Sequence, residues 1–123
     1  MPDLVFYTAP PDVKEVELVS DEVTTMCPKT GNPDFYTVRV RYSPRERILC
    51  TKALKEWFTE QRTAGHSCEG FAQAVYRLLR EPLDPIWLHV EVTQKPRGGI
   101  AITAQCRGLG STNPYEKEGD DAA

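Results

Sequence analysis

Residues 27–42 read CPKTGNPDFYTVRVRY, a turn-rich loop that runs directly into an alternating pattern. Pro28, Gly31 and Pro33 punctuate the loop, because proline fixes its own φ and glycine permits positive φ. From residue 35 to 42, valines then alternate with arginines, which is typical of a half-exposed antiparallel strand. The stretch therefore predicts a constrained loop at 27–34, followed by a strand at 35–42 that has one apolar and one polar face.

The same loop carries two chemically active side chains. Cys27 heads it, and Asp34 follows Pro33, so a turning backbone can bring the carboxylate back toward the thiol. This pair suits covalent catalysis, with the thiolate as nucleophile and the carboxyl group moving protons. A buried free cysteine beside a turn explains the same residues without any catalysis. From spacing alone, both interpretations stay open.

The periodicity of the rest of the chain predicts an α+β fold. Apolar residues recur at helical spacing after Thr51, and again after Ser67, which is a suitable N-cap. The elements expected in order are strands at 16–23 and 35–42, helices from Thr51 and from Ser67 to Pro82, and strands at 86–93 and 100–106 joined by a turn at 96–99. They predict a four-stranded antiparallel sheet with two helices between its second and third strands, on one face.

Length and composition bound the class of protein. The chain has 123 residues, and we expect one domain over residues 1–107, with an extended leader at 1–14 and a flexible tail at 108–123. A net charge of −3 argues against a general nucleic-acid binder. The sequence has no apolar run of the roughly 18–20 residues that a membrane span needs, and no basic, apolar start typical of a signal peptide. We therefore expect a cytoplasmic protein without a membrane partner.

The chain contains four cysteines, Cys27, Cys50, Cys68 and Cys106, and no CxxC pair. No zinc ribbon is indicated, no metal site is predicted, and free thiols are expected in a reducing compartment. Convergence of Cys27, Cys50 and Cys68 in one pocket would allow a soft metal or a protective disulfide. Small neutral side chains at these positions are an equally good explanation.

Several motifs together resemble the 7-cyano-7-deazaguanine reductases, the nitrile reductases of queuosine biosynthesis. The resemblance covers roughly residues 6 to 106 and rests on residues 27–35, 52–55, Glu69, 84–85 and 96–99. It implies the tunnelling fold and self-association into pentamers or decamers with active sites between subunits. The implied substrate is a small 7-deazaguanine molecule.

The resemblance also implies roles for individual residues. Cys27 would add to the nitrile carbon to give a thioimide, Asp34 would supply the proton to nitrogen, and two hydrides from NADPH would complete the reduction to an amine. Glu69 would recognise the guanine-like edge, although an acidic residue at a helix start is also favoured by the helix dipole alone. The other implied substrate-binding positions are Cys50, Thr51, Ser67 and Cys68. The implied cofactor-binding positions are Lys52, Lys55, Arg97 and Gly98; alone, the two lysines would be read as a solvated helix face.

This sequence departs from the family at two pairs of positions. Cys50 and Thr51 stand where the family usually has Glu-Ser, and Ser67 and Cys68 stand where it usually has Phe-His. The first change removes a hydrogen-bond acceptor for a guanine edge. The departures favour an alternative, the related amidinotransferases, which use the same cysteine and aspartate to add ammonia to 7-cyano-7-deazaguanine within tRNA, without NADPH. Retention of the whole 27–35 loop, both lysines and Arg97 favours the reductase.

Overall fold

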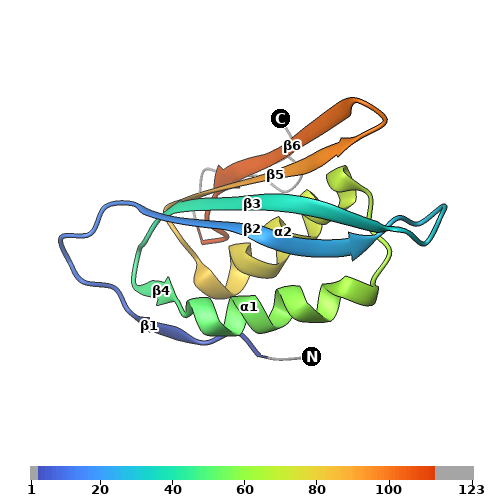
Figure 1. Cartoon of the computed structure of the whole chain (residues 1–123). Coiled ribbons are helices and arrows are strands. Elements are labelled where there is room, and N and C mark those ends of the chain that lie inside the picture. The colour runs from blue at the N-terminus through green and yellow to red at the C-terminus, as the bar shows by residue number, and fades with distance from the viewer. Residues whose placement is uncertain (1–2, 113–123) are drawn as a thin grey trace.

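The computed structural model describes residues 3–112 and is shown in Figure 1. Its strands and helices follow the predicted order, with two further short strands. The elements are β1 (Phe6–Thr8), β2 (Val16–Met26), β3 (Pro33–Ser43), β4 (Arg47–Leu49), α1 (Thr51–Glu60), a 3₁₀ turn η1 (Gln61–Thr63), α2 (Cys68–Leu83), β5 (Trp87–Arg97) and β6 (Ile100–Leu109).

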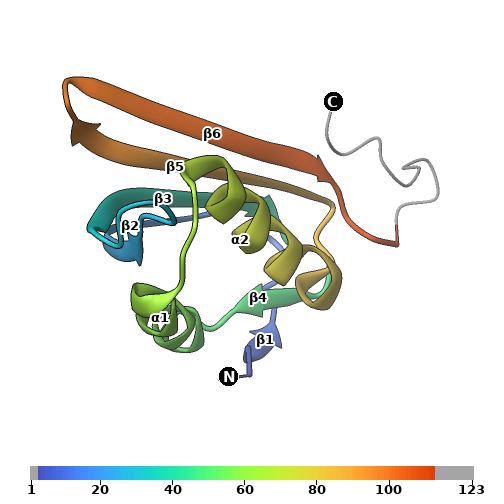
Figure 2. The ribbon, with the colours of Figure 1, turned by 90° about the vertical axis from the view of Figure 1, so that its right-hand side faces the viewer.

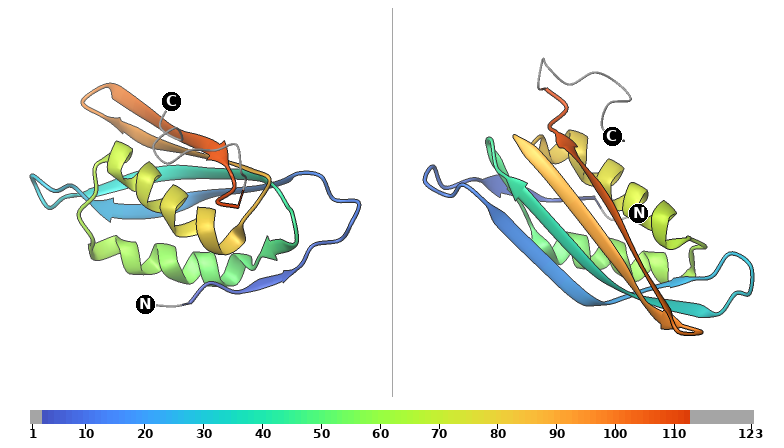
Figure 3. Two further views of the ribbon diagram at one scale, coloured as in Figure 1. Left: turned by 180° about the vertical axis from the view of Figure 1, so that it is seen from behind. Right: turned by 90° about the horizontal axis from the view of Figure 1, so that it is seen from above.

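The four long strands form one antiparallel sheet in the order β2-β3-β5-β6. Both helices lie on the same face of this sheet, with α2 against β5 and β6, and α1 alongside β2 (Figure 2). The predicted α+β architecture is confirmed, including the placement of both helices between the second and third strands of the sheet. Seen from above, β2 and β6 form the two edges of the sheet (Figure 3, right).

The core lies between the sheet and the helices. On β3, Tyr36, Val38, Val40 and Tyr42 alternate inward and are at most 1 % exposed. Val38 pairs with Val92, and Val40 pairs with Val90 on β5. Helix α2 contributes Phe71, Val75 and Leu79, all completely buried. Burial of this apolar surface is the main term that holds the layers together.

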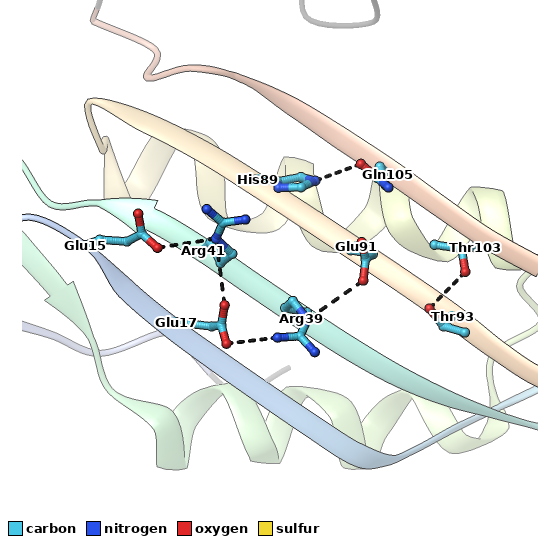
Figure 4. A network of polar contacts seen from close by, with 9 residues as sticks. All are labelled: Glu15, Glu17, Arg39, Arg41, His89, Glu91, Thr93, Thr103 and Gln105. Atoms are coloured by element: carbon cyan, nitrogen blue, oxygen red, sulfur yellow. Dashed lines mark hydrogen bonds and ion pairs between the residues drawn. The ribbon is translucent and has the colours of Figure 1, made fainter.

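The opposite face of the sheet is polar, as Figure 4 shows. Arg39 donates to Glu17 at 2.9 Å and lies 3.8 Å from Glu91, while Arg41 lies 3.4 Å from Glu15. These ion pairs run across neighbouring strands at partly exposed positions, where each contributes little to stability. The alternation of valine and arginine in β3 therefore separates the core face from this polar face, as the sequence predicts.

The end of α2 and the extent of the β5–β6 turn differ from the predicted boundaries. Helix α2 does not end at Pro82 but at Leu83, because proline in the last turn removes only one hydrogen bond near the helix end. Asp84 then ends the helix in the left-handed conformation, at φ 45°. The tight turn is confined to Gly98 and Gly99, with φ of 62° and 85°, as a two-residue hairpin turn requires. Pro96 and Arg97 belong to β5, not to the turn.

The predicted leader and tail are only partly described. Within the leader, Phe6–Thr8 forms β1 and pairs with β4, a two-stranded element that the sequence pattern did not reveal. At the other end, β6 continues to Leu109, past the expected domain boundary, and residues 113–123 lie outside the described residues. No helix in the described range 3–112 has the length and apolar character needed to cross a bilayer.

Gly110→Ala is expected to destabilise the fold by about 2 kcal/mol or more, because overpacking against fixed backbone is costly. A Cβ at Gly110 would lie 1.7 Å from the carbonyl oxygen of Pro85. Gly65→Ala is the matched control, since its Cβ would meet Pro28 only at ordinary contact distances of 3.7 and 3.8 Å. Urea unfolding followed by circular dichroism, at one protein concentration, measures both; equal stability of the two variants would contradict the packing at Gly110.

Candidate active site

The loop between β2 and β3 is closed by its own backbone. The amide of Cys27 donates to the carbonyl of Asn32 at 2.8 Å, and the amide of Gly31 donates to the carbonyl of Cys27 at 2.9 Å. Gly31 has φ 73°, a conformation that favours glycine. Beyond the loop, Thr25 pairs with Asp34. Diagonal neighbours on one face of such a pair lie about 7–8 Å apart, so the register brings Cys27 and Asp34 close together.

A β-bulge decides which way Cys27 faces. The pairing of β2 with β3 shifts by one residue between Ser20 and Val23. Ahead of the shift the even-numbered residues of β2 face the helices, and after it the odd-numbered ones do, so Val23 and Thr25 are buried. Because side chains alternate along a strand, this shift turns Cys27 toward the same side of the sheet as Asp34.

Residues 64–66, which follow η1, form backbone hydrogen bonds with Met26 at the end of β2 and so hold the β2–β3 loop in place. The amide of Met26 donates to the carbonyl of Ala64 at 3.0 Å, and the amide of His66 donates to the carbonyl of Met26 at 3.1 Å. The ring of His66 lies 3.0 Å from the side-chain oxygen of Gln61, and burial lowers the pKa of His66. Residues 64–66 therefore tie the start of α2 to the residue that precedes Cys27.

The Cys27 thiol is activated by its own loop. Its pKa is lowered to about 7, chiefly by a hydrogen bond from the Thr30 side chain, and further by backbone amides of Thr30 and Lys29. Partial burial and the negative charge of Asp34 act in the opposite direction. Hydrogen-bond donors that face a sulfur stabilise its charged form. A substantial share of Cys27 is therefore thiolate at neutral pH.

Asp34 is buried and is held by an arginine. Its side chain is 6 % exposed, and Nη1 of Arg97 donates to Oδ1 at 2.5 Å. Arg97 comes from the end of β5, where a second one-residue shift in pairing lies between Gln94 and Arg97. The Arg97 side chain itself is 44 % exposed. The structure thus places a predicted cofactor-binding residue directly on the predicted proton donor, with Gly98 beside it in the turn.

The predicted substrate-binding residues at the start of α2 are in different environments. Ser67 caps the helix, since its hydroxyl accepts from the Gly70 amide at 3.0 Å. Glu69 is exposed in the first turn. Cys68 is 1 % exposed, donates to the carbonyls of Val92 and Ile102 at 3.5 and 3.7 Å, and has a pKa raised mainly by burial. This placement does not favour a direct substrate contact by Cys68, because its sulfur lies inside the core.

The remaining predicted residues, Cys50, Thr51, Lys52 and Lys55, lie at the N-terminus and in the first half of α1. Cys50 is the N-cap, and its pKa is lowered mainly by the Ala53 amide and also by Tyr7, whose hydroxyl donates to the sulfur at 3.8 Å. Thr51, Lys52 and Lys55 line a groove of about 630 Å³ between β2 and α1. The C-terminal end of α1 leads through η1 to the segment that contacts the β2–β3 loop (Figure 1), and the helix is about 15 Å long. Thr51 and Lys52, at its start, therefore lie at the end of α1 farther from that loop, and Lys55 lies halfway along.

The predicted site residues therefore fall into two groups within one chain. Cys27, Asp34 and Arg97 lie at the β2–β3 loop, close to the start of α2. Cys50, Thr51, Lys52 and Lys55 lie along α1. Within one chain the three thiols do not converge in one pocket, because Cys50 heads α1 and Cys68 is in the core. None of the four cysteines forms a disulfide, and residues 3–112 hold no cluster of metal-ligating side chains.

Sequence reasoning missed three contributors to the site. Thr30 lowers the pKa of Cys27, Gln61 holds the His66 ring, and the Tyr36 hydroxyl links Thr25, at 3.2 Å, to the carbonyl of His66, at 3.5 Å. Only Thr30 carried a usable signal, since a hydroxyl three residues after a cysteine in a tight turn can reach back to the sulfur. The other contacts depend on how distant segments meet.

Comparison with known proteins identifies the family. A family model described as "QueF-like protein" matches residues 33–111, more than half of the chain. The chain belongs to the family of QueF-like proteins. This confirms the resemblance seen in the sequence motifs.

Individual relatives agree with this assignment. The NADPH-dependent 7-cyano-7-deazaguanine reductase of Chlorobium chlorochromatii (strain CaD3) is 40 % identical over 88 residues, which is 72 % of this chain and 76 % of the relative. The reductase of the same description from Bacillus mycoides (strain KBAB4) is 35 % identical over 99 residues, or 80 % of this chain. The match spans only 60 % of that relative's length.

A solved structure shares the fold. The archaeosine synthase QueF-Like in its apo form superposes with a TM-score of 0.72 at 21 % identity, covering 79 % of this chain and 95 % of that one. At this identity the likeness shows the shared fold of a four-stranded sheet and two helices. It does not separate one activity in the family from another.

Alkylation of Cys27 by iodoacetamide is expected to rise with pH around a midpoint of about 7, because the thiolate is the reacting form. Thr30→Val should move this midpoint upward, since it removes the largest stabilising hydrogen bond. Thr103→Val, on the polar sheet face, is the control and should leave the midpoint in place. Mass spectrometry of the Cys27 peptide follows the reaction, and an unchanged midpoint in Thr30→Val would show that the loop does not activate the thiol.

Proposed function

We propose that the chain is an NADPH-dependent 7-cyano-7-deazaguanine reductase, which reduces a nitrile to a primary amine. The observation that carries the proposal is the pairing of an activated thiol with a buried carboxylate. Cys27 has a pKa of about 7, and Asp34 lies beside it on the same side of the β2–β3 hairpin. The names of the curated relatives support the substrate and the cofactor.

The proposed first step is addition of Cys27 to the nitrile. A sulfur–carbon bond forms, one π bond of the nitrile breaks, and the electron pair moves to nitrogen. Asp34 accepts the thiol proton, or holds one already released, and passes it to that nitrogen, so the product is a neutral thioimide. A nitrile is a weak electrophile, and protonation of its nitrogen as sulfur attacks divides a difficult reduction into easier steps.

NADPH would supply two hydrides, the first to the thioimide carbon and the second to the carbon of the imine that forms when the Cys27 sulfur leaves as thiolate. Lys52 and Lys55 suit its phosphates, because both are exposed cations that line the groove beside β2. Arg97 and Gly98 are the second candidate contact, at the end of the β5–β6 hairpin. The side chains present therefore fit an anionic dinucleotide.

Glu69 is the proposed recognition group for the substrate. Its carboxylate is exposed at the start of α2, a segment tied through residues 64–66 to the Cys27 loop. A carboxylate can accept two hydrogen bonds at once from the ring N–H and exocyclic amine of a guanine-like edge. Ser67 holds the first turn in place as its cap, so it acts on recognition through Glu69.

We also propose self-association into pentamers or decamers, with sites completed between subunits. Within one chain, Lys52 lies at the end of α1 farther from the Cys27 loop and Lys55 lies halfway along, so a neighbouring copy is the natural source of a second group of residues. Strands β2 and β6 are the edges of the long sheet, and their free backbone groups suit pairing with other copies.

The alternative function is an amidinotransferase that adds ammonia to the nitrile of 7-cyano-7-deazaguanine in tRNA, without NADPH. Two observations favour it. Arg97 is engaged by Asp34, and Lys52 and Lys55 lie along α1, so none of the three predicted cofactor-binding cations is both beside Cys27 and uncommitted. Cys50 also lacks the carboxylate that the reductases usually have.

Consumption of NADPH separates the two functions. With free 7-cyano-7-deazaguanine and NADPH, the reductase should lower cofactor absorbance with about two NADPH oxidised per nitrile, as four-electron reduction to an amine demands. Thioimide formation without NADPH oxidation, followed by turnover with ammonia on tRNA, would instead establish the transferase.

Cys27→Ala should abolish the covalent adduct, because it removes the proposed nucleophile. Cys106→Ala is the matched control, since Cys106 lies on β6 away from the loop. Intact-protein mass spectrometry after mixing with substrate reads out both variants. An adduct that persists in Cys27→Ala would end the covalent mechanism.

Asp34→Asn should still bind substrate but slow nitrile activation by about 100-fold or more, the usual range for loss of a general acid. Pre-steady-state measurement of adduct formation gives the rate, and substrate titration gives the affinity. Near-normal adduct formation in Asp34→Asn would mean that the proton comes from another group, with His66 the next to be tested.

A further inference from the structure

Arg97 has capacity for two anionic partners. A guanidinium carries five N–H donors. One of them, on Nη1, is bound to Asp34, which is 6 % exposed, while the Arg97 side chain is 44 % exposed. One side of the group therefore faces a buried carboxylate, and the rest faces solvent at the end of a two-residue hairpin turn.

The contact also connects Arg97 to Cys27. The negative charge of Asp34 raises the pKa of Cys27, against the hydrogen bonds that lower it to about 7. A guanidinium 2.5 Å from Oδ1 offsets that charge. Whatever draws Arg97 away from Asp34 therefore also changes the reactivity of Cys27, through the charge of Asp34.

We propose that Arg97 is an exchangeable counter-ion, which neutralises Asp34 while Cys27 attacks and then moves to a phosphate-bearing ligand. The inference rests on the proposed function and adds an order of events to it. Arg97 is a positioning residue in this scheme, because it acts on the reaction through Asp34.

The exchange gives Asp34 two successive states. With Arg97 bound, the carboxylate is oriented and its charge is offset, and it relays the proton of the Cys27 thiol to the nitrile nitrogen as the sulfur attacks. Once Arg97 turns to the phosphate, the carboxylate loses its counter-ion and takes a proton from water. It can then give that proton to the substrate nitrogen while a hydride reaches the carbon, so charge and atoms balance at each reduction.

The test uses iodoacetamide and the full pH profile of Cys27 alkylation, without the nitrile substrate. Arg97→Gln should raise the midpoint by about one pH unit, which lowers the thiolate fraction at pH 7 about fivefold. Arg97→Lys should keep the midpoint near that of the wild type, since it keeps the charge. Arg107→Gln, on β6 near its far end, is the control and should change nothing.

NADPH and inorganic pyrophosphate serve as probes of the exchange. Each should raise the Cys27 midpoint in wild-type protein, leave the rate at high pH unchanged, and have no further effect in Arg97→Gln. A lower rate at high pH with an unmoved midpoint would indicate simple obstruction of the thiol and would overturn the proposal. So would an unchanged midpoint in Arg97→Gln, or an equal ligand effect in Arg97→Gln and wild type.

These outcomes are separable from failure of the proposed function. The alkylation profile needs no nitrile, so it can support or overturn the exchange even if 7-cyano-7-deazaguanine forms no adduct. Conversely, suppose that Cys27 forms the adduct and NADPH is oxidised normally, but the alkylation midpoint is the same in Arg97→Gln and wild type. That result would support the reductase function and overturn the proposed exchange of Arg97.

Discussion

Two one-residue shifts in strand pairing govern the arrangement of the site. The first, on β2, turns Cys27 toward the helix-covered side of the sheet, and the second, on β5, does the same for Arg97. Asp34 lies between them on β3. Because side chains alternate across a sheet, a regular β2 would direct Cys27 to the polar face, away from the carboxylate. The bulges therefore assemble three side chains that a regular sheet would separate.

The rest of the site depends on this arrangement. The backbone bonds around Met26 tie the Cys27 loop to residues 64–66, which lead into the first turn of α2. Glu69 is thereby held at the same end of the sheet as the thiol. The cofactor candidates on α1, Lys52 and Lys55, lie at its far end and halfway along, which is why assembly with further copies is central to the proposed function.

The sequence predicted the fold well because its signals were local. Alternation in β3, the apolar stripes of α1 and α2, and the Gly98–Gly99 turn each specify an element without reference to the others. The short pair β1 and β4 escaped prediction, because three-residue strands carry no measurable periodicity. The pairing of Phe6 with Leu49 depends instead on contacts across more than forty residues of chain.

The site was predictable in part. The loop motif pointed to Cys27 and Asp34, and the structure brings them to one side of the same hairpin. The partner of Asp34 was not predicted: Pro96 inside β5 is a sign of a bulge, since proline donates no hydrogen bond to a neighbouring strand, but the sequence motif placed it in the turn. The burial of Cys68, which the sequence motif assigned to substrate binding, was not predictable either, because it depends on how the first turn of α2 packs its sulfur against β5 and β6.

Strand register brings Cys27 and Asp34 close enough for the charge of Asp34 to act on the thiol. The most direct test of this effect is a site-resolved titration of Cys27 in wild-type protein and in Asp34→Asn, read by mass spectrometry of the Cys27 peptide. We expect a midpoint of about 7 in the wild type and a lower one in Asp34→Asn, because a negative charge that opposes the thiolate is removed. An identical midpoint in the two proteins would contradict this effect of Asp34 on the thiol.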